Sequence, residues 1–588
     1  MEAARDVVQR PVRERSAADE EDNDSPSTKT VNYEQVAAQL ELPALRGSSY
    51  AELRDQFRLP TPPLFNLFTA CVERHDSAAP ALVVEHPDGR YQSYSFGDIA
   101  GMVARLANAL RGLGLRAGDR VAVLMPQSLE VALTHMAAYR AGMVAVPLSY
   151  LFGPDALSYR LADSGARALV TDRTGLEKVS DVWIELPELA IIITTEPTGS
   201  VGPRIRALPD LLSAASSTFE TAPTKAEQPA LLIYTSGTTG RSKGALHAHR
   251  VILGNLPGFC LSHNFFPQAE DVFWSPADWA WAGGLFDALL PTWYCGRPIL
   301  AAPIGHFDPE WAHRLIAKHR VRNTFLFPTA LKMMRQSGLR PLAGQRLRSI
   351  STGGEAMGEE VLAWGREDLG VIINEFYGQT EANYFVGNCA ERWPVRSGSM
   401  GRPYPGFDVQ VQRLDGSPAA AGEVGEIVVH KPSATMFLEY WQQPEATAGK
   451  FRGEWLLTGD QARFDSDGYL WFEGRADDII NSAGYRIGPT EIEDCLLKHP
   501  AVAFAAVVGV ADATRGEVIK AFLVLRGDAV PGLDLEADLR QHVKVRLAAY
   551  QYPRYFEFVD ELPMTTSGKI RRNELRRMAR EQPGKQPS

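Results

Sequence analysis

The chain of 588 residues is poor in cysteine, and this scarcity already narrows its class. It has five cysteines, and no two of them form a C-x-x-C pair: Cys71, Cys260, Cys295, Cys389 and Cys495. Cysteines this far apart argue against a disulfide framework and against a thiolate metal site. A reducing cytoplasm is the compartment that we expect for such a chain.

Long apolar runs and an excess of positive charge are also missing. The sequence has no run of about 18 apolar residues, and its first residues are charged where a secretory signal needs an apolar stretch. We therefore expect a soluble, unexported protein without a membrane span. Lys and Arg number 61 against 71 Asp and Glu, a formal net charge of -10, which disfavours binding to the phosphate backbone of nucleic acids.

The composition that is present is typical of packed globular domains. Hydrophobic residues make up 45% and charged residues 22% of the chain. At roughly 100 to 200 residues per domain, the chain is too long for one core. Residues 1–60 are polar, with an acidic run at 19–24, and predict a flexible extension with at most a peripheral helix or two between 33 and 57.

Strand and helix patterns alternate from about residue 64 onward. Buried strands are expected at 120–125, 168–171, 190–194, 230–234 and 371–374, and helices at 99–113 and 129–141. This alternation predicts an α/β fold whose strands are largely parallel. After residue 474 the patterns predict a small α+β unit, with helices at 491–499 and 533–547 and strands at 502–510 and 520–525. We therefore divide the chain into 1–60, 61–474 and 475–588.

The strand expected at 230–234 runs into a loop of glycines and hydroxyl residues, TSGTTGRSKG at 235–244. Glycines let backbone N–H groups approach a polyphosphate, hydroxyls add donors, and a lysine offsets charge. A Walker A loop needs Gly before the lysine and Ser or Thr after it, but Ser242 and Gly244 stand there. A Gly/Ser/Thr stretch is by itself also typical of a linker. The nucleotide hypothesis assigns ATP binding to Thr235, Ser236, Gly237, Thr238, Thr239, Gly240 and Lys243.

The stretch from Tyr234 to Gly244 resembles the signature of the adenylate-forming superfamily, which holds acyl-CoA synthetases, peptide-synthetase adenylation domains and luciferases. Further superfamily motifs follow in the expected order: GGEA at 353–356, EFYGQTE at 375–381, TGD at 458–460, EGRADDIINSAGYR at 473–486 and PMTTSGK at 563–569. The resemblance covers about residues 64–580. It implies a large layered α/β AMP-binding domain and a small mobile α+β C-terminal lid. Ser242 stands where the family usually has proline.

The resemblance implies roles for individual residues in the adenylation step. Lys569 matches the lysine that reaches the carboxylate and the α-phosphate, and Arg486 matches an arginine that meets the nucleotide phosphate or substrate. Glu381 is the expected Mg²⁺ ligand, because this ion takes carboxylate oxygen together with phosphate oxygens, and Thr380 assists at the phosphates. The expected ribose and adenine contacts are Asp460, Arg475, Gly354, Glu355, Ala356, Glu375, Phe376, Tyr377, Gly378 and Gln379.

A second step, transfer of the acyl group to a thiol, has its own matching residues. The stretch Ala483, Gly484 and Tyr485 resembles the lining of a pantetheine tunnel. Arg515, and less directly Arg554, is an exposed cation suited to the CoA phosphates. Asp477 falls at the family hinge, where a few backbone angles turn the small domain between the adenylation and transfer arrangements.

The acyl pocket is predicted from small residues at matching positions. Gly378 stands where acetate-specific relatives have a tryptophan that closes the pocket, and by the same alignment Ala282, Gly283 and Gly353 fall where short-chain enzymes carry larger groups. Trp281 is a further substrate residue, in the segment 274–284 that resembles acetyl- and medium-chain acyl-CoA synthetases. An open pocket favours a longer acid, since each buried methylene adds up to about 0.8 kcal/mol. The resemblance to the medium-chain acyl-CoA and acetyl-CoA synthetase group favours a medium-chain fatty acid.

These features together predict an AMP-forming acid:CoA ligase that uses ATP, Mg²⁺ and CoA. An aryl-acid ligase of the benzoate kind, an enzyme that loads a carrier protein, and a luciferase-like oxygenase stay open as alternatives. A non-catalytic binding role is disfavoured, because Lys569, Glu381 and Asp460 are all present. Acyl length, oligomeric state and regulation by lysine acetylation are left open by the sequence.

Overall fold

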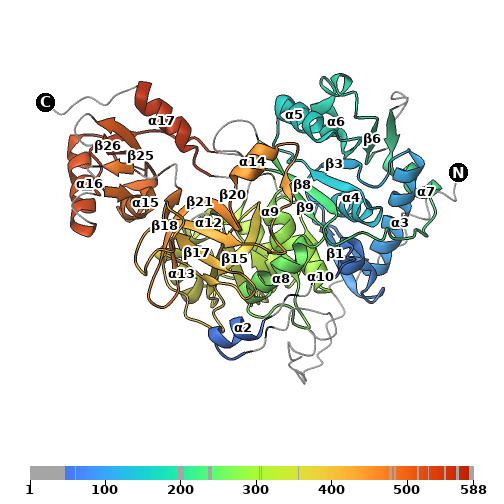
Figure 1. The fold of residues 1–588 in the computed structure, drawn as a ribbon, viewed down its shortest axis with the longest axis horizontal. Coiled ribbons are helices and arrows are strands. Elements are labelled where there is room, and N and C mark those ends of the chain that lie inside the picture. The colour runs from blue at the N-terminus through green and yellow to red at the C-terminus, as the bar shows by residue number, and fades with distance from the viewer. Residues whose placement is uncertain are drawn as a thin grey trace.

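The protein is described by a computed structural model (Figure 1). The described residues are 45, 47–57, 59, 61–196, 204–235, 242–303, 305, 307–354, 357–475, 478, 480–482, 485–512, 516–527, 529–547, 551–564 and 569–581, and among these the side chains of 481, 485, 486, 491 and 516 are left out. The predicted flexible extension therefore lies mostly outside the described residues. Its described end forms a short helix, α2 (Tyr50–Gln56), which places Leu53 in the core and agrees with the peripheral helix expected there.

Two sheets form the body of the large domain. One of them runs in the order β19-β9-β8-β4-β3-β5-β6-β7, and from β8 to β7 its neighbouring strands are parallel. Its strands are β3 (Arg120–Leu124), β4 (Val144–Pro147), β5 (Ala168–Thr171), β6 (Ile191–Thr194), β7 (Ile205–Ala207), β8 (Pro229–Thr235), β9 (Lys243–Ala248) and β19 (Glu439–Tyr440).

The other sheet is larger and mixed, in the order β17-β18-β21-β22-β16-β15-β14-β13-β12-β10-β11-β1-β2 with β20 beside β21. It is parallel from β1 through β14 and antiparallel from β15 onward. Its strands are β1 (Pro80–Glu85), β2 (Tyr91–Ser95), β10 (Phe273–Trp274), β11 (Ile299–Ala301), β12 (Asn323–Phe325), β13 (Ser349–Gly353), β14 (Ile373–Gln379), β15 (Ala382–Gly387), β16 (Ser399–Pro403), β17 (Val409–Gln412), β18 (Gly425–His430), β20 (Phe451–Arg452), β21 (Trp455–Phe464) and β22 (Leu470–Arg475).

Helices cover both faces of the parallel sheet, and alternate residues of β3 show how. Val121 and Val123 belong to the same core cluster as α3 and α4, whereas Ala122 and Leu124 pack with α5 and α6. A strand buried on both faces reads as a continuous apolar run, which is why this strand was predictable. The helices of the large domain are η1 (Thr69–Glu73), α3 (Phe96–Gly112), α4 (Leu129–Arg140), α5 (Pro154–Ser164), α6 (Arg173–Val179), η2 (Trp183–Glu185), α7 (Leu208–Ala214), α8 (Val251–Ser262), α9 (Ala282–Gly284), η3 (Leu285–Leu289), α10 (Leu290–Tyr294), α11 (Pro309–Lys318), α12 (Pro328–Ser337), α13 (Glu359–Glu367) and α14 (Pro444–Gly449).

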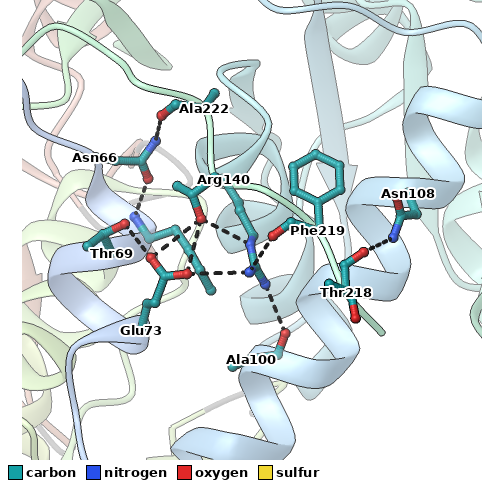
Figure 2. Close-up of polar contacts among 11 residues, drawn as sticks. Asn66, Thr69, Glu73, Ala100, Asn108, Arg140, Thr218, Phe219 and Ala222 are labelled. Atoms are coloured by element: carbon teal, nitrogen blue, oxygen red, sulfur yellow. Dashed lines mark hydrogen bonds and ion pairs between the residues drawn. The ribbon is translucent and has the colours of Figure 1, made fainter. Parts of the chain in front are cut away.

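A buried arginine joins the outer helices, remote from the motifs (Figure 2). Arg140, at the end of α4, donates to the carbonyl oxygens of Phe219 at 2.8 Å and Ala100 at 3.2 Å, and forms an ion pair with Glu73 at 3.4 Å. Because a buried guanidinium needs partners for its several N–H groups, this cluster fastens η1, α3 and the 218–222 segment to α4.

The C-terminal unit is a separate small sheet with helices on both faces. The sheet runs in the order β24-β23-β26-β25 with β27 beside β26, from β23 (Ile480–Ser482), β24 (Tyr485–Ile487), β25 (Val502–Asp512), β26 (Gly516–Leu525) and β27 (Tyr555–Phe558). One core packs β25 and β26 against α15 (Pro489–Leu497) and α16 (Leu533–Arg546), and another packs them against α17 (Arg572–Glu581). Figure 1 shows this unit, orange to red, at one end of the molecule.

The α/β class predicted for the chain is confirmed, with a large layered domain followed by a small α+β unit. The predicted division before Arg475 falls at the last residue of β22, and the division stays a prediction. Within the described residues, none of the helices combines the length and the apolar character that crossing a bilayer would require.

Candidate active site

The strands that flank the glycine-rich loop hold its two described ends together. Thr235 is the last residue of β8 and Lys243 the first of β9, and the two are register partners. The Thr235 hydroxyl donates to the Lys243 carbonyl oxygen at 3.4 Å. Ser236, Gly237, Thr238, Thr239 and Gly240 lie outside the described residues. The loop therefore leaves and re-enters the sheet at adjacent points, with Lys243 at its exit.

Ser242, which stands where the family usually has proline, is anchored by two side chains of α5. Arg160 donates from Nη2 to the Ser242 hydroxyl at 2.6 Å, and the Tyr159 hydroxyl donates to the Ser242 carbonyl oxygen at 2.8 Å. A proline would restrict this residue through its ring. Here, side-chain hydrogen bonds supply the restraint instead.

A tyrosine links the predicted metal ligand to the predicted phosphate lysine. β19 pairs with β9, so that Tyr440 lies beside the strand that follows the loop. The Tyr440 hydroxyl donates to Glu381 Oε1, and both residues are buried. Lys243 Nζ lies 5.1 Å from the centre of the Tyr440 ring, within the range of a cation–π interaction. Thr380, half-buried, precedes Glu381 in the turn between β14 and β15.

The predicted ribose carboxylate is buried among hydrogen-bond donors. Asp460, 5% exposed, accepts at Oδ2 from the Tyr377 hydroxyl at 2.5 Å and from Gln379 Nε2 at 2.6 Å. Arg475 Nη1 lies 3.4 Å from Oδ1. Burial raises the pKa of Asp460, and the Arg475 charge works against that rise. Lys450, which donates to Gln379 Oε1 at 3.4 Å, adds a second cation.

The predicted adenine segment lies at the ends of β13 and β14. Gly354 follows β13 with φ +94°, a left-handed conformation that glycine adopts without strain. Glu355 and Ala356 lie outside the described residues. Glu375 in β14 is buried, and burial, followed by the negative charge of Asp494 in α15, raises its pKa to about 8.

The predicted acyl residues gather around three aromatic rings. A Cβ added at Gly353 would lie 3.0 Å from the Phe376 ring, and one at Gly283 would lie 3.0 Å from the Phe325 ring. The Phe325 and Phe376 ring centres are 5.6 Å apart, and Phe376 stacks on Tyr384 at 4.0 Å. These glycines therefore let aromatic rings approach the backbone closely. The open acyl pocket stays a prediction.

The remaining acyl-side residues occupy two different settings. Trp281 and Ala282 are half-buried, and the Trp281 ring meets the Phe152 ring edge-on at 5.6 Å. Gly378 lies in β14, where an added Cβ would be 2.6 Å from the backbone nitrogen of Tyr384 and 2.8 Å from Asn383 Oδ1. A tryptophan at this position would need the neighbouring strand β15 to shift.

The C-terminal unit contacts the large domain beside the predicted adenine segment. α15 packs against β22, and Lys498 Nζ lies 3.8 Å from Glu359 Oε2 across the two units. Lys569 is exposed, next to an isolated bridge between Met564 and Ile570. Among the other predicted residues of this unit, Arg554 is exposed, with its guanidinium 5.1 Å from the centre of the Tyr552 ring. Of Tyr485 and Arg486, in β24, the structure describes the backbone, and Asp477, Ala483, Gly484 and Arg515 lie outside the described residues.

Two residues of this region were missed by the sequence reasoning: Tyr440 and Lys450. Neither lies in a motif, and each joins the site through a contact between segments far apart in sequence. Trp441 and Pro444 near Tyr440 suggest a turn, but no local pattern signals that its hydroxyl meets Glu381.

The chain is similar to known proteins over most of its length. The family described as AMP-binding enzyme matches residues 68–441, and the family described as AMP-binding enzyme C-terminal domain matches residues 491–569. The human mitochondrial acyl-coenzyme A synthetase ACSM4 is 34% identical over 507 residues, which cover 85% of this chain and 86% of the relative.

Two solved structures extend the comparison. An acyl-CoA synthetase of Brucella canis superposes with a TM-score of 0.71 at 32% identity, covering 92% of this chain and all of that one. A benzoate CoA ligase of Burkholderia xenovorans superposes with a TM-score of 0.76 at 27% identity, covering 87% of this chain and 100% of that one. The family match over residues 68–441, together with these relatives, shows that the chain belongs to the family of AMP-binding enzymes.

Proposed function

We propose that the protein is an AMP-forming acid:CoA ligase. A carboxylate attacks the α-phosphate of ATP, which gives an acyl-adenylate and pyrophosphate; a CoA thiol then takes the acyl group and releases AMP. The observation that carries the proposal is the meeting of Lys243, Glu381 and Tyr440 beside the phosphate loop. The resemblance to named acyl-CoA synthetases supports the same reaction.

The adenylation step brings two anions together, so the site must supply cations and oriented donors. Lys243 offsets phosphate charge at the exit of the loop, and Asp460 with its donors binds the ribose. Lys569, on the C-terminal unit, reaches the carboxylate and the α-phosphate when the two units close. Arg486 assists at the phosphate or the substrate.

Glu381 suits a magnesium ion that arrives with the nucleotide. Mg²⁺ in proteins is commonly held by one or two carboxylates together with substrate phosphates and water. Glu381 supplies one buried carboxylate, and its Oε1 is oriented by the Tyr440 hydroxyl. Bound Mg²⁺ would offset charge on the phosphates.

The transfer step needs the C-terminal unit in a second arrangement. Asp477 is the proposed hinge, and Ala483, Gly484 and Tyr485 line the path of the pantetheine arm, with Arg515 at the CoA phosphates. Asp477→Pro is expected to impair one half-reaction more than the other; equal impairment of both would argue against a hinge at this residue.

A medium-chain fatty acid is the proposed substrate class, and an aryl acid is the alternative. The sequence resemblance supports the first. The rings of Phe325 and Phe376 beside Gly283 and Gly353, together with the similarity to a benzoate CoA ligase, support the second. All five cysteines are buried and lie far apart in the sequence, which fits the proposed cytoplasmic location.

The test is AMP release from ATP and Mg²⁺ with acetate, butyrate, hexanoate, octanoate, decanoate or benzoate, each with and without CoA. The proposal expects CoA-dependent AMP release with a maximum at the middle chain lengths. A maximum with benzoate keeps the reaction and replaces the acid. AMP release that ignores CoA but requires a phosphopantetheine carrier protein would overturn the ligase assignment.

A further inference from the structure

A buried carboxyl group lies among the residues predicted for the acyl pocket, and no motif accounts for it. Asp287 is 4% exposed and sits in η3, directly after the segment that contains Trp281 and Gly283. η3 is a π-helix, and such turns are rare and concentrate at functional sites.

Asp287 has an unusual set of partners for a buried acid. Asn383 Nδ2 in β15 donates to Asp287 Oδ1, and Asn383 is itself 5% exposed. In the described part of the chain, Asp287 Oδ2 accepts no hydrogen bond and no lysine or arginine forms an ion pair with this carboxyl group. Oδ2 is not one of the fully enclosed atoms without a partner, so this oxygen of an otherwise buried carboxyl group is open to a ligand. For packing alone, an apolar pair of the same size would serve at least as well.

The unmatched oxygen faces the acyl side. A Cβ added at Gly283 would lie 3.7 Å from Asp287 Oδ2, so the absence of a side chain at Gly283 leaves this oxygen approachable from that direction. Asn383 in turn borders Gly378, where an added Cβ would lie 2.8 Å from its Oδ1. Asp287 and Asn383 therefore lie between Gly283 and Gly378, two glycines that the sequence analysis assigns to the acyl pocket.

The surroundings of the pair are aromatic. The Phe325 ring lies against Gly283, the Phe376 ring lies against Gly353, and the Tyr384 ring stacks on Phe376. Burial raises the pKa of Asp287 well above its ordinary value, with the Asn383 donor acting against the rise. A carboxyl group in such a setting gains most from a donor brought by a ligand, because that donor replaces the hydrogen bond lost on burial.

We propose that Asp287, oriented by Asn383, is a specificity-determining residue, and that the acid activated by this protein carries a hydrogen-bond donor, a hydroxyl or amino group, on its acyl part. This inference rests on the proposed ligase function. The Asp287 side chain accepts the donor at Oδ2, while Asn383 occupies Oδ1. Acids that lack the donor leave Oδ2 unmatched in the complex.

The test compares matched acids that differ only in the donor, with the full-length protein, ATP, Mg²⁺ and CoA. The pairs are hexanoate with 6-hydroxyhexanoate and 6-aminohexanoate, and 3-phenylpropanoate with its 4-hydroxy and 4-amino derivatives. Since an unmatched buried polar group costs about 1 to 3 kcal/mol, kcat/KM for the better donor acid is expected to exceed that of its parent by about 5- to 140-fold. The hydroxy and amino arms show which donor is used.

Two variants of Asp287 and a control complete the test. Asp287→Leu is expected to abolish or invert the preference. Asp287→Asn keeps the size of the side chain and replaces Oδ2 by an N–H donor. It is expected to lower the preference for the amino-substituted acids over their parent acids by about tenfold or more. Thr292→Val, which removes a fully buried hydroxyl without a described partner, is expected to leave the preference unchanged.

The outcomes separate the two proposals. Equal kcat/KM for donor acids and parent acids, with CoA-dependent AMP release, overturns the role of Asp287 and keeps the ligase function. If no acid releases AMP, the ligase function fails, and calorimetric binding of the same acids in the presence of ATP and Mg²⁺ then decides the inference: a preference for donor acids that Asp287→Asn removes supports it, and equal or no binding overturns it.

Discussion

Removal of one hydroxyl group tests the link between the predicted metal ligand and the phosphate loop. In Tyr440→Phe the ring and its position 5.1 Å from Lys243 Nζ are kept, and only the hydrogen bond to Glu381 is lost. A hydrogen bond to a charged group contributes about 1.5 to 3 kcal/mol. At about 1.4 kcal/mol for each factor of ten, kcat/KM for MgATP should fall by about 10- to 150-fold.

The assay is acid-dependent exchange of pyrophosphate into ATP, measured over a range of Mg²⁺ concentrations. If the Tyr440 hydroxyl orients the Glu381 carboxylate toward the metal, Tyr440→Phe needs more Mg²⁺ to reach its maximum rate. Glu381→Gln should show a Mg²⁺ defect at least as large, and the double variant should be no worse than Glu381→Gln alone, since the Tyr440 hydroxyl acts through the Glu381 carboxylate.

Tyr469→Phe is the matched control. Tyr469 is fully buried and its hydroxyl donates to the Pro394 carbonyl oxygen at 2.7 Å, so the variant loses a buried hydrogen bond to a neutral group. It is expected to lose about 0.5 to 1.5 kcal/mol of stability without a change in Mg²⁺ dependence. An unchanged Mg²⁺ dependence in Tyr440→Phe, or additive defects in the double variant, would refute the reasoning.

Three further predictions address the other parts of the site. Lys569→Ala should lose acyl-adenylate formation but still convert preformed acyl-adenylate to acyl-CoA, and normal pyrophosphate exchange in this variant would contradict the role of the lysine. Glu375 has its folded-state pKa raised to about 8 from an ordinary value of 4.5, so its stabilising contribution is complete below about pH 4.5 and declines by about 1.4 kcal/mol per pH unit as the pH rises toward 8. The unfolding free energy of Glu375→Gln, measured by chemical denaturation, should therefore rise relative to that of the wild type by about 2 kcal/mol between about pH 6.0 and 7.5. If the difference between variant and wild type is the same at both pH values, Glu375 ionises normally in the fold. Gly378→Ala places a Cβ 2.6 Å from the backbone nitrogen of Tyr384, so adenylation and thermal stability should both fall, and wild-type values for both would mean that β15 shifts freely.

Strand and helix positions in the parallel part of the fold could be read from the sequence. The strand expected at 168–171 is β5 (Ala168–Thr171), and the helix expected at 533–547 is α16 (Leu533–Arg546). Parallel strands covered on both faces consist of short continuous apolar runs, so local composition suffices to find them. The larger mixed sheet was not predicted, because its order joins strands such as β16 and β22 that are far apart in the chain.

The sequence by itself determined the chemistry of the motifs: a glycine-rich loop that ends in Lys243, a carboxylate at Glu381, and another at Asp460. These are local patterns whose residue types alone suit phosphate, metal and ribose. Only the tertiary structure decided what surrounds them. The pairing of β19 with β9 brings Tyr440 near Glu381, and Asp287 in η3 accepts a hydrogen bond from Asn383 in β15, 96 positions further along the chain. Contacts of this kind depend on how distant segments pack together, and no local sequence pattern encodes that packing.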